Sequence, residues 1–214
     1  LKQPGESLAG RVSYLELGPL DLLEIQPDQQ DLLWVRGGFP ESLLAPSAQA
    51  SLRWRDDFIR TYLERDIPQF GPRIAAQTLR RFWTMLAHLQ GQLFNASQLG
   101  LSLGGASHTT AARYLDTLVD TLMVRRLEPH LANVGKRLVK SPKVYVRDAG
   151  LLHALLGLAT VKDLQGHPVA GLSWEGLVVE QVAAALPADA RMGFYRTAAG
   201  AEIDLVIERR SRKI

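Results

Sequence analysis

Two acidic residues near the end of the chain have the type and spacing that could hold a metal ion. Glu175 lies in the apolar segment "LSWEGLVVEQVAAAL", and Asp204 lies in the middle of "AEIDLVIE", the second arm of an expected hairpin. Mg²⁺ takes hard oxygen ligands and keeps several waters, so a few carboxylates are enough to bind it. A metal-bound water could then attack a phosphodiester. If the helix packs under the hairpin, Glu175 and Asp204 are expected to be the metal ligands and catalytic residues of a nuclease-like site.

The same residues have a plainer explanation, and one part of such a site is missing. A carboxylate near a helix N-terminus, such as Glu175 after the expected cap Ser173, is favoured by the exposed N–H groups alone. The acidic residues of the hairpin could likewise form a solvated strand face. The usual third component is a Glu-x-Lys on the next strand, but the sequence reaches its last residues, "RRSRKI", where that strand would begin. Both explanations stay open.

A second group of candidates lies between residues 95 and 147. "NASQLGLSLG" predicts a short helix that begins at Asn95 or Ser97, and "SHTTAARYLDTLVDTLMV" predicts a longer helix capped by Ser107. "RRLEPHLANVGKRLVKSPKVYVRD" then predicts two strands around a basic loop. Helix, short helix, turn, helix and hairpin is the order of a winged helix-turn-helix.

This segment offers residues that could contact DNA. The start of the longer helix could reach base edges and the basic loop could reach phosphates. The nucleic-acid-binding candidates are His108, Thr109, Arg113, Lys136, Arg137, Lys140 and Lys143. However, Asp116 and Asp120 on the outward face of the same helix would repel the DNA backbone. The sequence therefore leaves two alternatives: weak or non-specific DNA contact, or a winged helix used for packing or protein contact.

Further helices are expected to position these groups. Apolar residues at helical spacing predict one helix from Ser51 to Pro68 and another over "AAQTLRRFWTMLAHLQGQL". "DAGLLHALLGL" predicts a short apolar helix, followed by a loop over "TVKDLQGHPVAG". A largely buried helix capped by Ser173 and ended by Pro187 comes next. Residues 1–50 are expected to be strand and loop.

Composition narrows the class of protein. The chain has 214 residues, of which 46% are hydrophobic and 22% charged, as in globular domains. It has no cysteine, which excludes disulfides and thiolate metal sites. The net charge of +3 is too small to imply a polyanionic partner by itself. No apolar run approaches the ~20 residues of a membrane span, so we expect a cytoplasmic protein that does not enter the membrane.

Several longer motifs resemble a known family. "ESLAGRVSYLELGPL", "GGFPES", "YLERDI", "SPKVYVRDAGLLHALLGL", "WEGLVVEQV" and "FYRTAAGAEIDLVIE" are similar to the C-terminal half of a family of prokaryotic AAA+ ATPases. In that family the ATPase core is followed by a domain of unknown function that resembles PD-(D/E)xK nucleases. The resemblance implies that Glu175 and Asp204 match the two acidic positions of the nuclease-like motif.

The resemblance also implies what the whole protein would contain. The apolar residues Val12, Tyr14, Leu15 and Leu17 by themselves suggest a buried strand near the start. By the resemblance, residues 1 to about 20 would be the last strand of the ATPase core, with Arg11 sensing a γ-phosphate or a neighbouring subunit. ATP and Mg²⁺ would be cofactors of that parent protein. No G-x-x-x-x-G-K-[ST] occurs in these 214 residues, so this fragment is expected to bind no cofactor of its own.

The sequence thus predicts an α+β chain in three parts. Residues 1–50 are the tail of the ATPase core, 51–150 a helical segment with a winged helix-turn-helix, and 151–214 a truncated, restriction-endonuclease-like α/β domain. The expected function is a DNA- or partner-binding module that is inactive alone. The alternatives are a metal-dependent nuclease domain without its Glu-x-Lys strand, and a module that docks another protein subunit without any nucleic-acid role.

Overall fold

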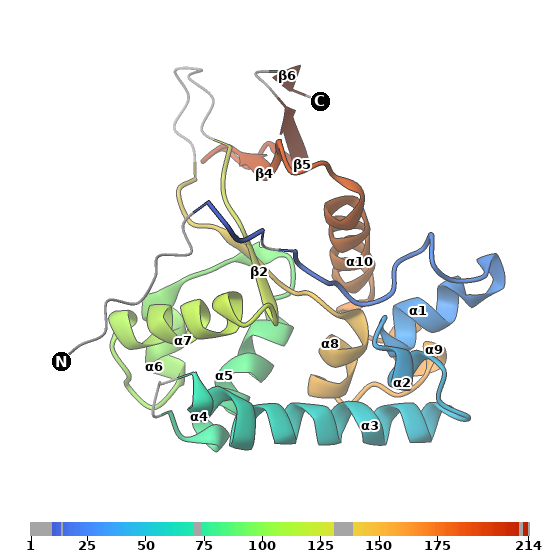
Figure 1. The fold of residues 1–214 in the computed structure, drawn as a ribbon. Helices are drawn as coiled ribbons and strands as arrows, with labels where there is room; N and C mark the ends of the chain where they lie inside the picture. Colours follow the sequence, from blue (N-terminus) through green and yellow to red (C-terminus); the bar gives the residue numbers. More distant parts are fainter. Residues whose placement is uncertain (1–9, 14, 71–73, 131–138, 210–211, 214) are drawn as a thin grey trace.

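The computed structural model describes residues 10–13, 15–70, 74–130 and 139–209, and the backbone of 212–213. It is a mixed α+β fold in which helices predominate over two small three-stranded sheets (Figure 1). The upright helix α10 connects the helical part to the second sheet. Among the described residues, no helix has the length and apolar character needed to cross a membrane.

The first part of the chain differs from the expectation. No strand occurs in the described part of residues 1–50; the elements there are helical: η1 Pro27–Gln29, α1 Gln30–Arg36, α2 Pro40–Leu43 and the start of α3 Ala48–Thr61. The buried strand predicted around Val12, Tyr14, Leu15 and Leu17 is wrong for this structure, since Leu15 is 93% and Leu17 is 95% exposed. Tyr14 lies outside the described residues. Alternating apolar residues form a buried strand only where a neighbouring strand edge is present, and no strand of the described chain pairs with them.

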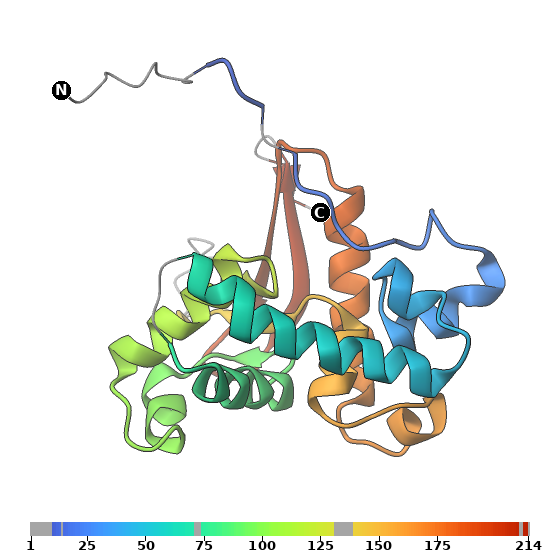
Figure 2. The same cartoon turned by 60° about the horizontal axis from the view of Figure 1, so that its bottom comes forward.

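The two predicted central helices are present. The first, α3 Ala48–Thr61, is capped by Ser47 and continues through a π-helical turn, η2 Tyr62–Asp66, into α4 Ile67–Gln69. Pro68 therefore lies in the first turn of α4, where a missing N–H is tolerated. The second is α5 Ala76–His88, which buries Leu79, Phe82, Trp83 and Leu86 and is shorter than the segment predicted to be helical. The helix α3 crosses the molecule, with α8 against it (Figure 2).

The segment after α5 has the predicted order of elements. A short strand precedes two helices whose caps are confirmed: the Asn95 side chain accepts from the Gln98 N–H, and Ser107 accepts from the Thr110 N–H. The strands form an antiparallel sheet in the order β1-β3-β2. The elements are β1 Gln92–Leu93, α6 Ala96–Ser102, α7 His108–Asp120, β2 Val124–Leu127 and β3 Lys143–Val146.

The last part contains the expected hairpin but differs at two points. A helix with a Thr160–Asp163 capping box replaces part of the predicted loop. The long apolar helix begins at Ala170, so Ser173 lies inside it and is not its cap. The second sheet has the order β4-β5-β6. The elements are α8 Ala149–Leu155, α9 Val161–Gln165, α10 Ala170–Ala185, β4 Ala190–Arg196, β5 Glu202–Arg209 and β6 Arg212–Lys213.

The two sheets are joined through their backbones. The Phe194 N–H donates to the Glu128 carbonyl at 3.1 Å, and the His130 N–H donates to the Phe194 carbonyl at 2.6 Å. On the other side of the loop, the Val139 N–H donates to the Arg196 carbonyl at 3.1 Å. The hairpin formed by β2 and β3 is therefore attached to β4.

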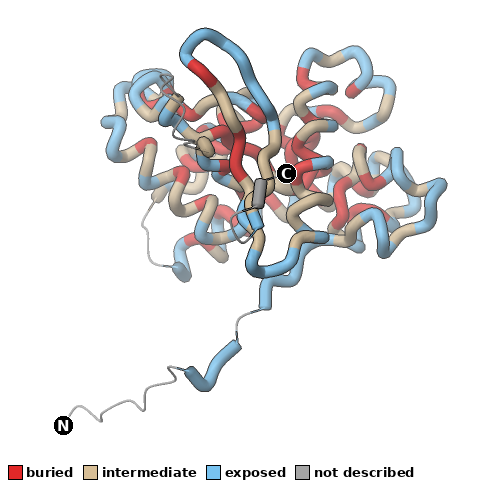
Figure 3. The backbone as a smooth tube through the Cα atoms, turned by 90° about the horizontal axis from the view of Figure 1, so that it is seen from above, coloured by how far each residue is buried: buried red, intermediate tan, exposed pale blue. Residues whose placement is uncertain are grey.

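Helix α10 packs on the helical part through a buried histidine. The Nδ1–H of His153 donates to the Val35 carbonyl at 3.0 Å, which leaves Nε2 to accept the Ser173 hydroxyl at 2.7 Å. The Ser173 oxygen also accepts from Trp34 Nε1 at 3.0 Å. His153 and Ser173 are buried, and Trp34 is half-buried. Figure 3 shows the buried backbone inside the molecule and the exposed tip of the β4–β5 hairpin. The contacts require neutral His153.

A close contact between α1 and α8 lies next to this histidine. A Cβ on Gly150 would come within 2.1 Å of the Arg36 carbonyl oxygen, so only glycine allows the two backbones to approach. The buried Arg55 side chain donates to the Val35 and Gly150 carbonyls at 3.1 and 2.8 Å. These bonds tie α3 to both helices.

We predict that acid destabilises the protein through His153. Burial lowers the pKa of His153 from 6.5 to about 4. Because the folded pKa lies below the unfolded one, the stabilisation is complete above pH 6.5 and is lost as the pH falls toward 4. The loss should reach about 3 kcal/mol. Urea unfolding across this range should show a smaller pH slope for His153→Gln than for the wild type, whereas equal slopes would contradict the assignment.

Candidate functional site

A buried lysine is surrounded by three carboxylates in this structure. Lys143 begins β3, and its side chain is only 3% exposed. Its ammonium lies 2.7 Å from Glu202 Oε1, 2.8 Å from Asp204 Oδ1 and 3.5 Å from Glu175 Oε1. We call Lys143, Glu175, Glu202 and Asp204 the lysine cluster. A buried ammonium is tolerated only with such partners.

Three elements far apart in the sequence build the lysine cluster. Lys143 comes from β3, the central strand of the first sheet. Glu175 comes from the second turn of α10, and Glu202 and Asp204 come from β5. The two β5 residues are separated by one position, so both side chains point to the same side of the strand. The hairpin and α10 thus present three carboxylates to one strand of the other sheet.

Neighbouring side chains fix the orientation of the carboxylates. The Tyr145 hydroxyl, fully buried two residues after Lys143, donates to Glu175 Oε1 at 2.6 Å. Arg196 pairs with the other oxygen of Glu202 at 3.3 Å. The ring of Phe194 lies 5.5 Å from the lysine ammonium, at cation–π distance. Lys143, Glu175 and Glu202 thus each have a further partner outside the lysine cluster, whereas Asp204 contacts Lys143 and is 61% exposed.

The electrostatics keep the lysine charged. Burial lowers the pKa of Lys143, but the hydrogen bonds to Asp204 and Glu202 and the charge of Glu175 outweigh burial, so its pKa is raised above 10.5. Burial, followed by the hydrogen bond to Glu175, raises the pKa of Tyr145 above 10.0. At neutral pH the lysine is therefore an ammonium and the tyrosine a neutral donor.

The structure brings Glu175 and Asp204 together, as the sequence predicted, but around Lys143. The helix-terminus explanation of Glu175 is wrong, because α10 begins at Ala170. In the described part of the chain, no three His, Asp or Glu side chains are arranged to hold a metal ion. The lysine ammonium fills the space between the carboxylates, so these residues as they stand do not fit the divalent cation that the nuclease-like motif implies.

The nucleic-acid-binding candidates divide into three groups. His108, Thr109 and Arg113 on α7 are exposed, and so is Lys140. Lys136 and Arg137 lie outside the described residues. Lys143 is buried in the lysine cluster and faces carboxylates, so it cannot meet a phosphate. Arg11, the nucleotide-sensing candidate, is exposed in a turn.

The negative charge on the outward face of α7 is partly neutralised by a basic residue of β2. Asp116 Oδ1 lies 2.7 Å from Arg126 Nη1 on β2. Asp120 lies at the C-terminal end of the helix, far from His108 at its start. The repulsion expected from Asp116 is therefore reduced by its own partner.

Sequence reasoning missed three members of this site. The sequence places Lys143 next to the basic loop, after other basic residues, and nothing local marks it as buried. Tyr145 gave no signal beyond its place in an apolar strand. Glu202 could have been found, because its spacing from Asp204 along a strand puts both carboxylates on one face.

We predict that Lys143→Met destabilises the fold by about 3 kcal/mol, because it leaves the half-buried side-chain carboxylates of Glu175 and Glu202 without their cationic partner. The pKa of Lys143 is raised, so the part of the stabilisation that depends on its protonation is present below pH 10.5 and is lost as the pH rises through the folded pKa. Urea unfolding at neutral pH measures the difference. Lys140→Met, at an exposed lysine nearby, should change stability by less than about 0.5 kcal/mol. Equal effects of the two substitutions would contradict the role of Lys143.

Comparisons with known proteins place the chain as follows. The family described as "Domain of unknown function (DUF4143)" matches residues 170–214. The uncharacterized protein Rv2008c of Mycobacterium tuberculosis and the uncharacterized protein Mb2031c of Mycobacterium bovis are each 52% identical over 203 residues. The match covers 95% of this chain and 46% of each relative, so the chain spans about half the length of these relatives. No solved structure matches. Residues 27–162, well over half of the chain, match the family described as "Domain of unknown function (DUF8612)", and the chain belongs to that family.

Proposed function

We propose that this chain is a binding module of a longer AAA+ ATPase, and that residues 76–147 form a winged helix-turn-helix that contacts DNA phosphates. The observation that carries the proposal is the arrangement of α5, β1, α6, α7, β2 and β3 with the strand order β1-β3-β2. In a winged helix the second helix of the turn faces the major groove, and the hairpin flanks it. Here α7 is that helix.

The start of α7 suits a phosphate. A helix N-terminus presents backbone N–H groups and the positive end of the helix dipole. Exposed His108 and Thr109 stand at this end, and exposed Arg113 follows just over one turn later. Ser107 caps the helix through the Thr110 N–H, so this end is well formed before any ligand binds.

Base-specific readout has less support than phosphate contact. The exposed residues at the start of α7 are few, and the hairpin that would act as the wing is attached to β4 by backbone hydrogen bonds. Lys140 is the basic residue of the loop that the structure describes as exposed. Such a surface favours binding that depends on salt more than on sequence.

The link to an ATPase rests on the comparisons and on the resemblance of the motifs. DUF4143 domains often stand next to AAA ATPase domains. The relatives are more than twice as long as the match, which leaves room for an ATPase core in a protein of their size. In this proposal ATP, Mg²⁺ and the nucleotide-sensing role of Arg11 belong to the parent protein.

We predict salt-dependent DNA binding that weakens in Arg113→Ala and Lys140→Ala. Fluorescence anisotropy with a short labelled duplex should show affinity falling between about 50 and 200 mM salt. Each substitution should reduce the slope of log affinity against log salt by about 1. Arg60→Ala is the matched control, because Arg60 is an exposed arginine on α3 that pairs with Asp57. A DNA affinity that does not change with salt concentration, or an equal loss of affinity in Arg60→Ala, would reject the proposal.

A second candidate function is phosphodiester cleavage. It is favoured by the convergence of Glu175, Asp204 and a lysine at one point. It is opposed by the position of that lysine, whose ammonium occupies the space between the carboxylates. In that case the resemblance to nucleases concerns the fold and not a cleavage reaction.

We therefore predict that this chain does not nick plasmid DNA in the presence of Mg²⁺ or Mn²⁺. The assay compares the wild type with Asp204→Asn and with Glu208→Gln, a carboxylate farther along β5. Nicking by the wild type that is lost in Asp204→Asn and kept in Glu208→Gln would overturn this prediction and establish the nuclease. Residual nicking that is equal in all three proteins would come from a contaminant, and the prediction would stand.

A further inference from the structure

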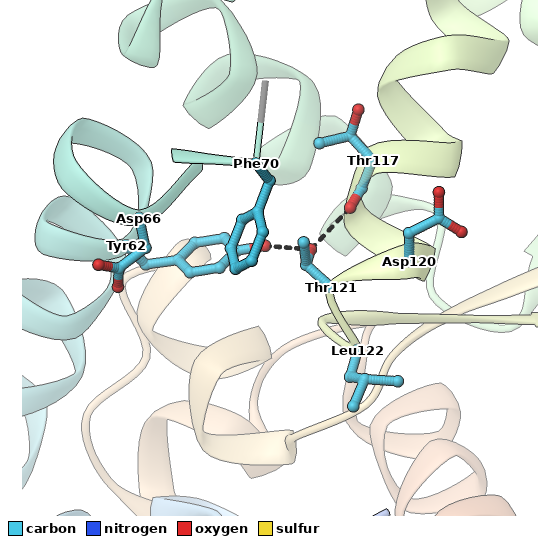
Figure 4. Close-up of a pocket in the computed structure, with 7 residues that line it drawn as sticks. All are labelled: Tyr62, Asp66, Phe70, Thr117, Asp120, Thr121 and Leu122. Atoms are coloured by element: carbon cyan, nitrogen blue, oxygen red, sulfur yellow. Dashed lines mark hydrogen bonds between the residues drawn. The ribbon is translucent and has the colours of Figure 1, made fainter. Parts of the chain in front are cut away.

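A cavity lies at the end of α7 opposite to the proposed DNA-binding end. Its volume is about 510 Å³, and it opens between the turn η2, the end of α4 and the last turn of α7 (Figure 4). Aromatic rings, threonine side chains, a leucine and two carboxylates line it. The lining residues are Tyr62, Asp66, Phe70, Thr117, Asp120, Thr121 and Leu122.

One wall of the cavity is rigid. The Thr121 hydroxyl donates to the Thr117 carbonyl at 2.6 Å, so it accepts from the Tyr62 hydroxyl, with which it makes a short hydrogen bond. Tyr62 is 5% exposed and is fixed by packing in the main core. Burial raises the pKa of Tyr62 to about 12, so its hydroxyl stays a donor at neutral pH.

The mouth of the cavity exposes apolar surface. Phe70 is 66% exposed, and Leu122 is 45% exposed. Leu122 is also the one described non-glycine residue with a positive φ, at 64°. Positive φ is the conformation that favours glycine after a helix end. A leucine there places an apolar side chain at the mouth of the cavity, where glycine would place none.

Two carboxylates stand on opposite sides of the cavity. Asp66 comes from η2, and Asp120 comes from the end of α7 (Figure 4). Neither makes an ion pair with any basic residue in the part of the chain that the structure describes. The cavity therefore combines the exposed ring of Phe70 with negative charge, and it would repel a phosphate.

We propose that this cavity binds an arginine side chain presented by a segment of a partner protein. A guanidinium is planar, stacks on aromatic faces and pairs with carboxylates through directed N–H groups. The exposed ring of Phe70 supplies the aromatic face, and Asp66 or Asp120 supplies the charge. A lysine ammonium could pair with the carboxylates but would stack less well on the flat ring of Phe70. Nucleic acid would be repelled by Asp66 and Asp120.

The inference goes beyond DNA contact and does not depend on it. Helix α7 has 13 residues, so its ends lie about 20 Å apart. A phosphate at His108 and an arginine at Asp120 would use opposite ends of one helix. The module could then hold DNA and a protein partner at the same time.

The test uses three short peptides that differ at one central position: arginine, citrulline, which has the same shape without charge, and norleucine, which is apolar. Two-dimensional NMR of the labelled chain reports both the affinity and the place of binding. We expect the arginine peptide to shift the amides of residues 62–70 and 117–122 and to bind at least about fivefold more tightly than citrulline or norleucine.

Matched variants separate the cavity from general surface charge. Asp66→Asn combined with Asp120→Asn should weaken arginine binding at least about fivefold, whereas Asp57→Asn, at an exposed carboxylate of α3, should not. Leu122→Gly should also weaken it, although glycine suits the positive φ, so loss of binding would not reflect unfolding. Thermal melts of each variant confirm the fold.

Three results would overturn the inference. Equal affinity for norleucine and arginine would mean an apolar groove without a charge requirement. Equal weakening by Asp57→Asn would mean non-specific attraction. Displacement of the arginine peptide by duplex DNA, with the same amides shifted, would assign the cavity to nucleic acid. The DNA titration of Arg113→Ala is unaffected by any of these outcomes, so failure here is distinguishable from failure of the proposed function.

Discussion

A lysine ammonium removed from water has to be surrounded by carboxylates, and this requirement organises the chain around Lys143. Desolvating an ammonium costs several kcal/mol, which only close and well-oriented anions can offset. The anions come from α10 and from β5, so neither element can leave without exposing an uncompensated charge. The part of the chain that matches DUF8612 supplies the lysine, and the part that matches DUF4143 supplies the carboxylates. One charge centre thus joins the two.

A second ionic centre fixes α10 to the same sheet and sets its rotation. Glu180 accepts from Arg125 on β2 at 2.8 Å and from Arg147, just after β3, at 3.0 Å. Glu175 and Glu180 lie on one helix, so satisfying both leaves little freedom to turn it about its axis. On β5, the contacts of Glu202 and Asp204 with Lys143 fix the register in which the strand pairs. A slip by one residue would turn Glu202 and Asp204 away from the lysine. Buried charges here specify position more than they add stability.

The sequence predicted those features that depend on local chemistry. The caps Asn95 and Ser107 and the buried face of α5 follow from short-range patterns, and the order of elements around residues 95–147 was correct. The features that it missed depend on what lies opposite a residue. Lys143 reads as one more basic residue near a loop, and the pattern around Leu15 reads as a strand. Only the fold shows that three carboxylates face Lys143, and that no described strand pairs with the segment around Leu15.

The same contacts decide how readily the lysine cluster could open. Withdrawing Lys143 from the carboxylates would require β3 to move away from β5. The hairpin of β2 and β3 is also bonded to β4 through Glu128, His130 and Val139. Those backbone bonds would have to break together with the ion pairs, and the ring of Phe194 would lose its contact with the ammonium. Opening therefore has the character of partial unfolding rather than of a loop motion. A ligand that needed the carboxylates free would have to supply that free energy itself, which is why the exposed end of α7 and the cavity at its other end are better placed to bind partners.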